Sequence, residues 1–398
     1  MKVYMIIQEP FPNGMAATNR IKSYVKAFQY AGVESRILIL SRTEYVDNVK
    51  NVDISGSYDG IPFQYMGDTT IRSRNLIVRK WNDFRDKNRL KQYLKENLVS
   101  GDIVFAYCGR EIGFIDDLIK ITHRCNAKFV RDLCELPFGT GKESLKAVVM
   151  RRYTLNIQFP KIDGFIPISE SLKTLTAKYI TAGNGKQLKV PIMVDFKKFD
   201  MDDASDMSEI PYIFHSGTLY EQKDGILGMI EGFGLACQQI AHPIQFILTG
   251  SVENSPHAKE ISLLIEKYKL QDKVLFTGYL SNEDLKQYLA KASLVIINKY
   301  RTQQNEYCFS TKLGEYLAAT KPLIITNVGE AVNWLKNQES AYIIDPEDTN
   351  ELARAIKNAF DDPEMRKCIA KNGKELCKKS FDYRVWGKAM VEFFESLY

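Results

Sequence analysis

The chain has 398 residues, of which 45% are apolar and 26% are charged, and its formal net charge is +5. This composition describes a soluble globular protein long enough for two domains, and it excludes a disordered chain. The small net charge does not require a nucleic-acid partner, and no stretch approaches the roughly 20 apolar residues that span a bilayer.

The first residues, MKVYMIIQEPFPNG, carry one lysine and a short apolar run that Gln8, Glu9 and Pro10 interrupt. This pattern predicts a first strand and not a signal peptide. The seven cysteines include no C-x-x-C pair, and the four histidines have no metal-ligand spacing. We therefore expect reduced thiols, a cytoplasmic location and neither a metal site nor a cofactor.

Short apolar runs rich in β-branched residues alternate with helical stretches in both halves of the chain. In the first half they are 3–7, 35–40, 61–65, 102–107, 128–133 and 164–169. In the second half they are 212–216, 245–249, 273–277, 294–298, 322–327 and 341–345. Apolar strands separated by helices predict parallel sheets covered on both faces, hence an α/β protein with two Rossmann-like, doubly wound domains.

A basic segment lies between Arg72 and Lys95, where nine Lys and Arg residues face only Asp83 and Asp86. Its interleaved apolar residues are Ile77, Trp81, Phe84 and Tyr93. On a helix, this pattern is typical of a cationic surface with aromatic anchors that lies on an anionic membrane leaflet. A solvated helix whose apolar residues pack on their own sheet is the alternative, and both interpretations stay open.

A polar, acidic stretch, KVPIMVDFKKFDMDDASDMSEI, separates the two halves. It predicts a first domain over residues 1–195 and a second over residues 205–381. The tail, residues 382–398, has apolar residues at helical spacing. Such a helix needs a surface to cover it, so we expect it to cross back to the first domain.

Two strand-to-helix loops of the second half are candidate ligand sites, since ligands bind beyond the carboxyl ends of parallel strands. In HSGTLYEQKDG, Gly217 ends a strand, and Thr218 and Lys223 follow. Glycine lets the backbone approach a ligand, and lysine supplies charge for phosphate. His215 precedes this loop and either lines the site or belongs to the core.

The second loop leads into FSTKLGEYLAATKPLIITN, which begins a helix with Ser310 and Thr311 and carries Glu315 one turn in. Capping explains these residues if Ser310 or Thr311 accepts from free backbone N–H groups. In a nucleotide site, the same N–H groups hold phosphate and Glu315 holds a ribose. This stretch alone does not decide between the two.

Taken in order and at their spacing, the segments resemble the retaining glycosyltransferases of family 4 over essentially the whole chain. The segments are PFPNGMAATNR, SGTLYEQKDGI, FILTGS, VLFTGYLSNEDL, FSTKLGEYLAATKPLI and AYIIDPEDTNELARAI. This family has the GT-B architecture, in which two Rossmann-like domains face each other across a cleft. The resemblance implies the same architecture here.

The resemblance also implies roles for residues that match the family motifs. Glu315 matches the acid that grips the nucleotide ribose, and Lys223 matches the lysine that faces the donor diphosphate. Ser310 and Thr311 fall where backbone amides meet phosphate and sugar. The remaining donor-binding positions implied are Gly217 and Thr218 in the phosphate loop, Tyr279 and Leu280 against the base, and Gly14 in the first-domain loop.

The chain departs from the family pattern at several positions. The family often has a second glutamate eight positions before Glu315, where this chain has Tyr307. Glu306 is one place off. Either Glu306 reaches the donor sugar, or the chain belongs to a subfamily without this acid. Thr218 stands where arginine is common. A first-domain histidine is missing from RDLCELPFGTG, which leaves Asp132 and Glu135 as polar candidates, with a purely structural turn as the alternative.

The family's chemistry implies transfer of a sugar from a nucleotide-diphosphate sugar to a hydroxyl, with retained configuration and no metal. A D-x-D sequence at residues 200–202 lies in the linker and is not expected to bind manganese. The expected catalytic residues are Lys223, Glu306, Glu135 and Asp132. The expected acceptor is a lipid-linked or surface-polysaccharide glycan at the inner face of the cell membrane. Rival interpretations are a non-catalytic GT-B subunit that binds a partner transferase, and a nucleotide-sugar epimerase or hydrolase.

Overall fold

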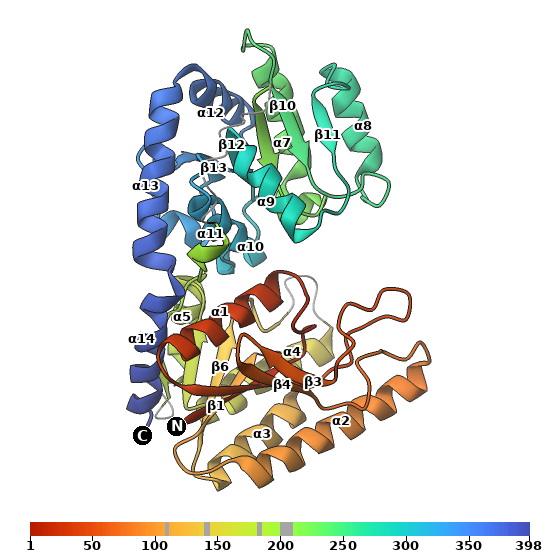
Figure 1. The fold of residues 1–398 in the computed structure, drawn as a ribbon, viewed down its shortest axis with the longest axis vertical. Coiled ribbons are helices and arrows are strands. Elements are labelled where there is room, and N and C mark those ends of the chain that lie inside the picture. The colour runs from red at the N-terminus through yellow and green to blue at the C-terminus, as the bar shows by residue number, and fades with distance from the viewer. Residues whose placement is uncertain (108–110, 139–143, 181–184, 200–209) are drawn as a thin grey trace. The chain divides into compact units, whose positions relative to one another are not determined.

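The computed structural model describes residues 1–398 except 108–110, 139–143, 181–184 and 200–209 (Figure 1). The D-x-D sequence at 200–202 therefore lies outside the described residues. The chain divides into two units, one made of Met1–Met193 with Tyr383–Tyr398 and the other of Val194–Asp382.

The first unit is built on an eight-stranded sheet in the order β3-β4-β2-β1-β5-β6-β7-β8. Its pairings are parallel except for β3 with β4, and Met5 of β1 lies opposite both Ile37 of β2 and Phe105 of β5. The strands are β1 Lys2–Ile7, β2 Glu34–Ile39, β3 Ser55–Tyr58, β4 Ile61–Tyr65, β5 Ile103–Tyr107, β6 Lys128–Leu133, β7 Gly164–Pro167 and β8 Lys186–Gln187.

Two of these strands, β3 and β8, were not predicted from the sequence. β3 is short and mostly exposed, and it pairs antiparallel with β4 through a two-residue turn. That turn is Asp59-Gly60, with φ angles of 48° and 82°. Asp-Gly with two positive φ angles is a strong hairpin signal. The first sheet is therefore mixed at its edge, not wholly parallel as predicted.

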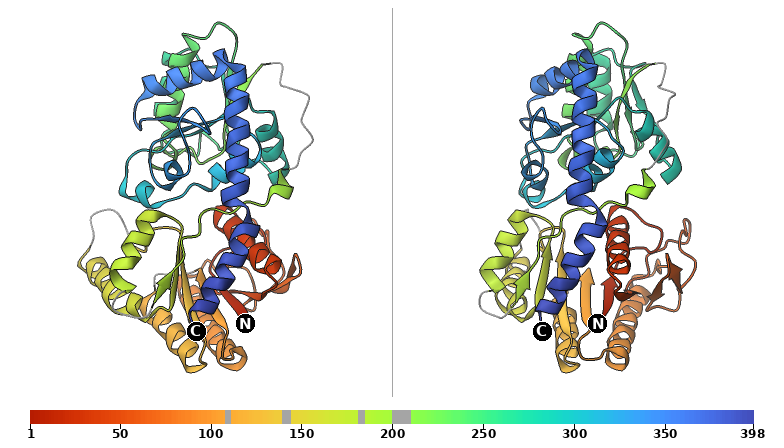
Figure 2. Two further views of the ribbon diagram at one scale, coloured as in Figure 1. Left: turned by 90° about the vertical axis from the view of Figure 1, so that its left-hand side faces the viewer. Right: turned by 60° about the vertical axis from the view of Figure 1, so that its left-hand side comes forward.

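Helices cover both faces of this sheet (Figures 1 and 2). They are α1 Ala16–Tyr30, α2 Leu76–Asn97, α3 Ile112–Arg124, α4 Leu145–Tyr153, α5 Glu170–Ile180 and the C-terminal α14 Tyr383–Ser396, with a π-helical turn Thr154–Gln158 and a 3₁₀ turn Phe159–Lys161. α14 lies along α1. A Cβ at Gly387 would lie 2.4 Å from the carbonyl oxygen of Ala27, so glycine allows this close approach. Phe394 adds aromatic packing, 5.8 Å from Phe28 between ring centroids.

The second unit has a wholly parallel six-stranded sheet in the order β11-β10-β9-β12-β13-β14. Its strands are β9 Tyr212–His215, β10 Gln245–Leu248, β11 Val274–Phe276, β12 Leu294–Ile297, β13 Leu323–Thr326 and β14 Tyr342–Ile344. Its helices are α6 Glu221–Asp224, α7 Ile226–Cys237, α8 Ala258–Lys267, α9 Asn282–Lys291, α10 Gln303–Tyr307, α11 Thr311–Ala318, α12 Thr349–Asp361 and α13 Pro363–Phe381, with 3₁₀ turns Phe196–Lys198 and Glu330–Asn333. The predicted fold class, two α/β domains on parallel sheets with a C-terminal helix on the first, is confirmed.

The strand order of the second sheet reverses beside β9. The chain runs from β9 through β10 to β11 on one side and then returns to β12 on the other side. The loops that follow β9 and β12 therefore leave the sheet in opposite directions. A sheet of this kind binds ligands at the carboxyl ends of the strands where the order reverses.

Candidate functional site

The loop that follows β9 is held by the protein itself. The Gly217 N–H donates to Thr249 Oγ1 at 2.9 Å, and the Thr218 N–H and hydroxyl donate to Asp224 Oδ2 at 3.1 and 3.2 Å. A Cβ at Gly217 would lie 2.6 Å from His215 Nε2. Glycine is thus required here by close approach to protein atoms, and these two backbone N–H groups are already engaged.

Asp224 lies at the centre of this region. Its carboxylate accepts from Lys312 Nζ at 2.5 Å, and His215 Nε2 lies 3.9 Å away. Burial alone would raise the pKa of Asp224, but Lys312 and His215 outweigh it and lower the pKa to about 2. Burial, reinforced by Lys312, lowers the pKa of His215 to about 4. His215 is neutral at pH 7, and its Nδ1–H donates to the Ile296 carbonyl at 2.9 Å.

Three lysines lie in this region, and Lys312 pairs directly with the Asp224 carboxylate. Lys223 is exposed on α6, and Lys299, just after β12, donates from Nζ to the Lys223 carbonyl at 3.1 Å. Burial and the neighbouring Lys312 lower the pKa of Lys299. A lysine pKa falls beside another lysine because each positive charge disfavours the next. The cluster of Lys223, Lys299 and Lys312 therefore carries more positive charge than Asp224 neutralises.

The first turn of α11 opens onto the same region. Ser310 occupies the N-cap position, but its side chain makes no capping hydrogen bond. Within the described part of the chain, the N–H groups of Thr311 and Lys312 have no acceptor. The capping interpretation is therefore wrong for Ser310. The helix start instead offers free donors and the positive end of its dipole, which suit an anion.

Glu315 projects from the next turn of α11 and is half-buried. No hydrogen bond or ion pair of its carboxylate joins it to another described residue. Burial raises its pKa, against the opposing effect of Lys312 and Lys198. Tyr316, the next residue, ties α11 to the β9 loop, because its hydroxyl accepts from the Ser216 N–H at 2.8 Å. Glu315 is thus a carboxylate held in place without a partner among the described residues.

The other predicted donor residues of this unit lie on separate elements. Glu306 is half-buried on α10. Tyr279 and Leu280 follow β11, and Tyr279 is 79% exposed. Their loop is joined to the end of β10, where the Gly250 N–H donates to the Gly278 carbonyl at 2.8 Å. All of these residues come after the carboxyl ends of strands, as predicted, while their individual roles stay predictions.

In the first unit, Gly14 lies on the exposed loop between β1 and α1. A Cβ there would lie 2.0 Å from Thr18 Oγ1, so glycine is required by the local packing. Asn51 holds this loop from the side, because its amide oxygen accepts from the Asn13 N–H at 2.8 Å and its Nδ2 donates to the Asn13 carbonyl at 2.8 Å.

The two carboxylates predicted near the reaction centre lie in different surroundings. Asp132 lies on β6, within the predicted strand 128–133, and forms a buried ion pair with Arg20 at 3.0 Å while accepting from the Tyr24 hydroxyl. Glu135 is exposed after β6. Burial and the charge of Glu135 raise the pKa of Glu9, which follows β1. Asp132 thus belongs to the buried interior, and Glu135 lies close to a second carboxylate, that of Glu9. A catalytic role for either residue stays a prediction.

Three residues of the second-unit site were not predicted to be site residues from the sequence, namely Asp224, Lys299 and Lys312. Asp224 directly follows Lys223 in EQKDG, and Lys312 directly follows Thr311 in FSTKLGE. Lys299 comes two residues after β12. Strand-end position was the available signal for Lys299, but only the folded chain brings the three together.

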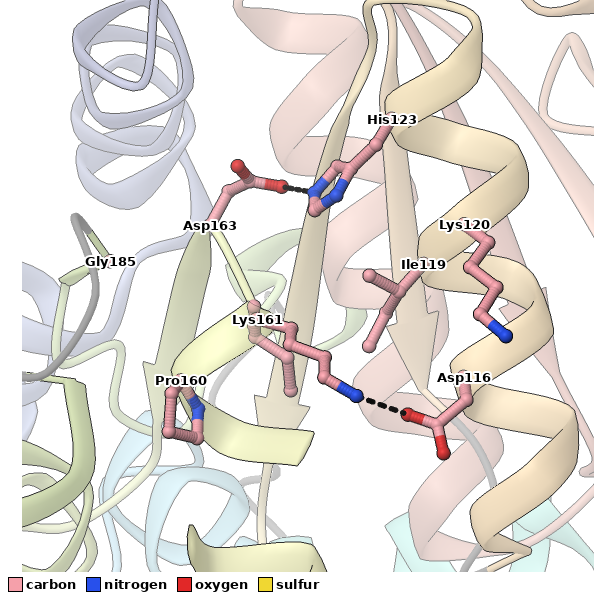
Figure 3. A pocket seen from close by; sticks show the side chains of 9 residues that line it. Asp116, Ile119, Lys120, His123, Pro160, Lys161, Asp163 and Gly185 are labelled. Atoms are coloured by element: carbon pink, nitrogen blue, oxygen red, sulfur yellow. Dashed lines mark hydrogen bonds and ion pairs between the residues drawn. The ribbon is translucent and has the colours of Figure 1, made fainter. Parts of the chain in front are cut away.

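A cavity of about 440 Å³ lies in the first unit, away from these loops (Figure 3). Its lining includes two polar pairs, His123 with Asp163 at 2.8 Å and Lys161 with Asp116 at 3.7 Å. His123 precedes β6 and Asp163 precedes β7, so the cavity lies at the amino ends of these strands. It contains none of the predicted site residues.

Among the residues that the structure describes, no three His, Cys, Asp or Glu side chains gather in a group that could hold a metal ion. None of the helices that the described residues form combines the length and apolarity needed to cross a bilayer.

Residues 198–376 match the family model of glycosyl transferases group 1. A lipopolysaccharide core biosynthesis glycosyltransferase, LpsD of Rhizobium meliloti strain 1021, is 28% identical over 145 residues, which are 36% of this chain and 40% of LpsD. A capsular polysaccharide biosynthesis glycosyltransferase, CapM of Staphylococcus aureus, is 24% identical over 250 residues, 58% of this chain and 60% of CapM. The matches thus span about half the length of these relatives.

The fold matches solved structures along the whole chain. The crystal structure of Anabaena HepE in complex with UDP has a TM-score of 0.72 and 15% sequence identity, and the match covers 100% of both chains. At this identity, the likeness establishes the fold, which is GT-B. The family match falls within the second unit, where the lysine cluster and α11 lie. The second unit is therefore a glycosyl transferases group 1 domain.

Proposed function

We propose that the protein is a retaining glycosyltransferase of family 4 that moves a sugar from a nucleotide-diphosphate sugar to a hydroxyl of a glycan. The observation that carries this proposal is the group of unneutralised donors at the strand reversal of the second sheet. It combines Lys312, which pairs with Asp224, and the neighbouring Lys223 and Lys299 with the uncapped start of α11. Such a group favours a diphosphate, which carries both negative charge and several acceptor oxygens.

The chemical step needs stabilisation of the leaving diphosphate. The bond between the anomeric carbon and the phosphate oxygen breaks with its electron pair on the phosphate, and the acceptor oxygen bonds to the same face of the carbon. The acceptor's proton passes to the departing phosphate oxygen, so no separate general base is needed. Preorganised positive charge lowers this barrier because it meets charge that develops in the transition state. Lys223, Lys312 and the α11 N–H groups take this role, and we propose that no metal takes part.

Glu315 is proposed to bind the ribose of the donor. Two vicinal hydroxyls donate to one carboxylate, and Glu315 has neither an ion pair nor a hydrogen bond with another described side chain. Hydroxyl donors favour the ionised carboxylate, so binding should lower the raised pKa of Glu315 toward its ordinary value. Nucleotide affinity should accordingly fall as the pH drops through that raised pKa.

The proposed acceptor is a lipid-linked or surface-polysaccharide glycan. LpsD and CapM are named for lipopolysaccharide core and capsular polysaccharide biosynthesis. Of the structures with this fold, HepE is described in complex with UDP-glucose. We propose a nucleotide-diphosphate sugar donor for this chain by the same likeness, with Tyr279 and Leu280 beside the base.

Thermal unfolding of the purified protein with UDP, GDP, ADP and their sugar conjugates tests the donor site. A nucleotide at ~100 times its Kd should raise the melting temperature by about 5 °C. Glu315→Ala and Lys223→Ala should abolish this rise, whereas Lys259→Ala, at an exposed position of α8, should retain it. No rise with any nucleotide at millimolar concentration would contradict the proposal. Donor consumption that requires an acceptor then separates a transferase from an epimerase, a hydrolase or a non-catalytic subunit.

A further inference from the structure

The first unit exposes an unusual group of large apolar side chains. On α2, Ile77 is 80% exposed, Trp81 64% and Phe84 59%. They recur at i, i+4 and i+7, so they share one face of the helix. The sequence alternative in which these residues pack on their own sheet is wrong for all three. Only Tyr93 turns inward, where its ring meets that of Tyr4 at 6.4 Å.

The loop that follows β2 extends this apolar face. Tyr45 is 58% exposed and Val46 60%. Arg72, just before α2, donates to the Tyr45 hydroxyl at 3.1 Å, and Arg74 pairs with Asp47. Figure 1 shows the start of α2 beside this loop at the edge of the unit. We call this group the docking surface, and its apolar members are Tyr45, Val46, Leu76, Ile77, Trp81 and Phe84.

Positive charge accompanies the docking surface. Several cations of the basic segment are neutralised by acids from other elements, namely Arg74, Arg85, Lys87 and Lys91. Others form no ion pair with any residue that the structure describes, namely Arg72, Arg79, Lys80 and Lys95. Lys80 lies on the helix between Ile77 and Phe84 and is exposed. The surface therefore keeps a positive surplus around its apolar members.

The docking surface is connected by hydrogen bonds to the loop that contains Gly14. Glu44 is buried in the β2 loop, and its carboxylate accepts from the N–H of Lys50 at 2.6 Å and from Asn51 Nδ2 at 2.8 Å. Asn51 in turn exchanges two hydrogen bonds with Asn13, next to Gly14. The loops after β1, β2 and β4 all leave the carboxyl edge of the sheet. The apolar face thus borders the edge at which an acceptor would be bound.

We propose that the docking surface binds the anionic leaflet of a lipid bilayer, so that a lipid-linked acceptor presents its glycan to the carboxyl edge of the first sheet. The acceptor part of this inference rests on the proposed function; the membrane contact does not. Exposed tryptophan is favoured at the membrane interface, and unpaired lysine and arginine are attracted to anionic headgroups. This mixture of apolar and cationic groups fits such a leaflet better than an apolar protein partner, which would leave the cations unmatched.

Co-sedimentation with vesicles tests the membrane contact. Vesicles of phosphatidylcholine with about one-third phosphatidylglycerol should bind the protein at low salt, and pure phosphatidylcholine should bind it at least about tenfold less. Trp81→Ser with Phe84→Ser, and separately Lys80→Glu, should each reduce binding to the anionic vesicles by about tenfold or more. Leu263→Ser is the matched control, because Leu263 is 65% exposed on α8 of the second unit.

None of the residues substituted in these variants belongs to the proposed donor site, so vesicle binding and nucleotide binding can be tested separately. Substitutions at exposed positions change stability little, and the rise in melting temperature with nucleotide should persist in all of them. Binding to neither vesicle, or equal binding to both, overturns the membrane proposal even if the nucleotide response is intact. So does a concentration-dependent dimer in light scattering that Trp81→Ser with Phe84→Ser abolishes, because the surface would then bind a second copy.

Discussion

Each unit holds a buried carboxylate paired with a cation near the carboxyl edge of its sheet, but the two pairs differ in their surroundings. Arg20 and Asp132 of the first unit are 4% and 1% exposed in their side chains. Lys312 of the second unit is 21% exposed, and its partner Asp224 is 7% exposed. The first pair is enclosed by the core, whereas the second keeps its cation open to solvent beside two more lysines. An ion pair between aspartate and a cation is therefore part of the buried interior in one unit, whereas in the other unit it leaves the cation exposed to solvent.

The charges around the pairs differ in the same sense. At the edge of the first unit, Glu9 and Glu135 repel each other, and burial with this repulsion raises the pKa of Glu9. At the edge of the second unit, the neighbouring groups are Lys223 and Lys299. An edge with two carboxylates suits a neutral hydroxyl-bearing ligand, and an edge with several lysines suits phosphate. The comparison supports the proposal that the first unit binds the acceptor and the second unit binds the donor.

The largest expected effect on the free energy of unfolding comes from breaking the buried Arg20–Asp132 pair. Arg20→Met leaves Asp132 buried without its cation, and Asp132 Oδ2 already has no hydrogen-bond partner among the described residues. The free energy of unfolding should fall by about 3 to 5 kcal/mol in urea denaturation. Arg20→Met with Asp132→Leu should recover most of this loss, because no buried charge remains. Nucleotide binding, measured by isothermal titration well below the melting temperature, should be unchanged, and its loss would contradict the separation of the two pairs.

Lowering the pH should weaken the second unit, because its buried His215 takes up a proton. His215 has a folded pKa of about 4 and an ordinary value of 6.5, so the unfolded chain binds the proton first. Its contribution is complete above about pH 6.5 and is lost as the pH falls through about 4, at a cost of roughly 3 kcal/mol. Asp224, with a pKa of about 2, adds a loss only below about pH 4.

His215→Gln isolates this effect, because glutamine removes the titrating ring and keeps a donor for the Ile296 carbonyl. Stability measured by urea denaturation between pH 7 and 4.5 should then decline less steeply than in the unchanged protein. Equal slopes in both proteins would show that the histidine is not the group responsible.

A somewhat smaller effect on stability is expected from breaking the partly exposed Lys312–Asp224 pair. Lys312→Met leaves Asp224 with hydrogen bonds from Thr218 alone among the described residues and should cost about 2 kcal/mol. Lys312→Met with Asp224→Asn should restore stability, since both charges are removed together. In contrast to the Arg20 double variant, this one should still lose the nucleotide-induced rise in melting temperature. Retention of that rise would place the diphosphate away from Lys312.

The sequence predicted the parts of the fold that depend on local pattern. Each predicted strand is present because buried parallel strands require unbroken β-branched runs. β3 was missed because its residues, SGSY, are polar and mostly exposed. The site was predicted less completely, since Lys223, Lys299 and Lys312 meet only when β9, β12 and α11 come together. Gly217 and Thr218 were correctly placed at the loop, but their N–H groups bind Thr249 and Asp224.

The smallest effect on stability, and the sharpest test of the donor edge, concerns Tyr279. Its side chain is 79% exposed, so Tyr279→Ala should change the free energy of unfolding by less than about 0.5 kcal/mol. If the base of the nucleotide stacks on this ring, affinity in isothermal titration should still fall by roughly three- to tenfold. Ribose 5-diphosphate, which has no base, should bind the variant and the unchanged protein equally. A loss of affinity for both ligands would instead mean that Tyr279 positions the neighbouring Gly250–Gly278 pairing, since removal of a stacking ring cannot weaken a ligand without a base.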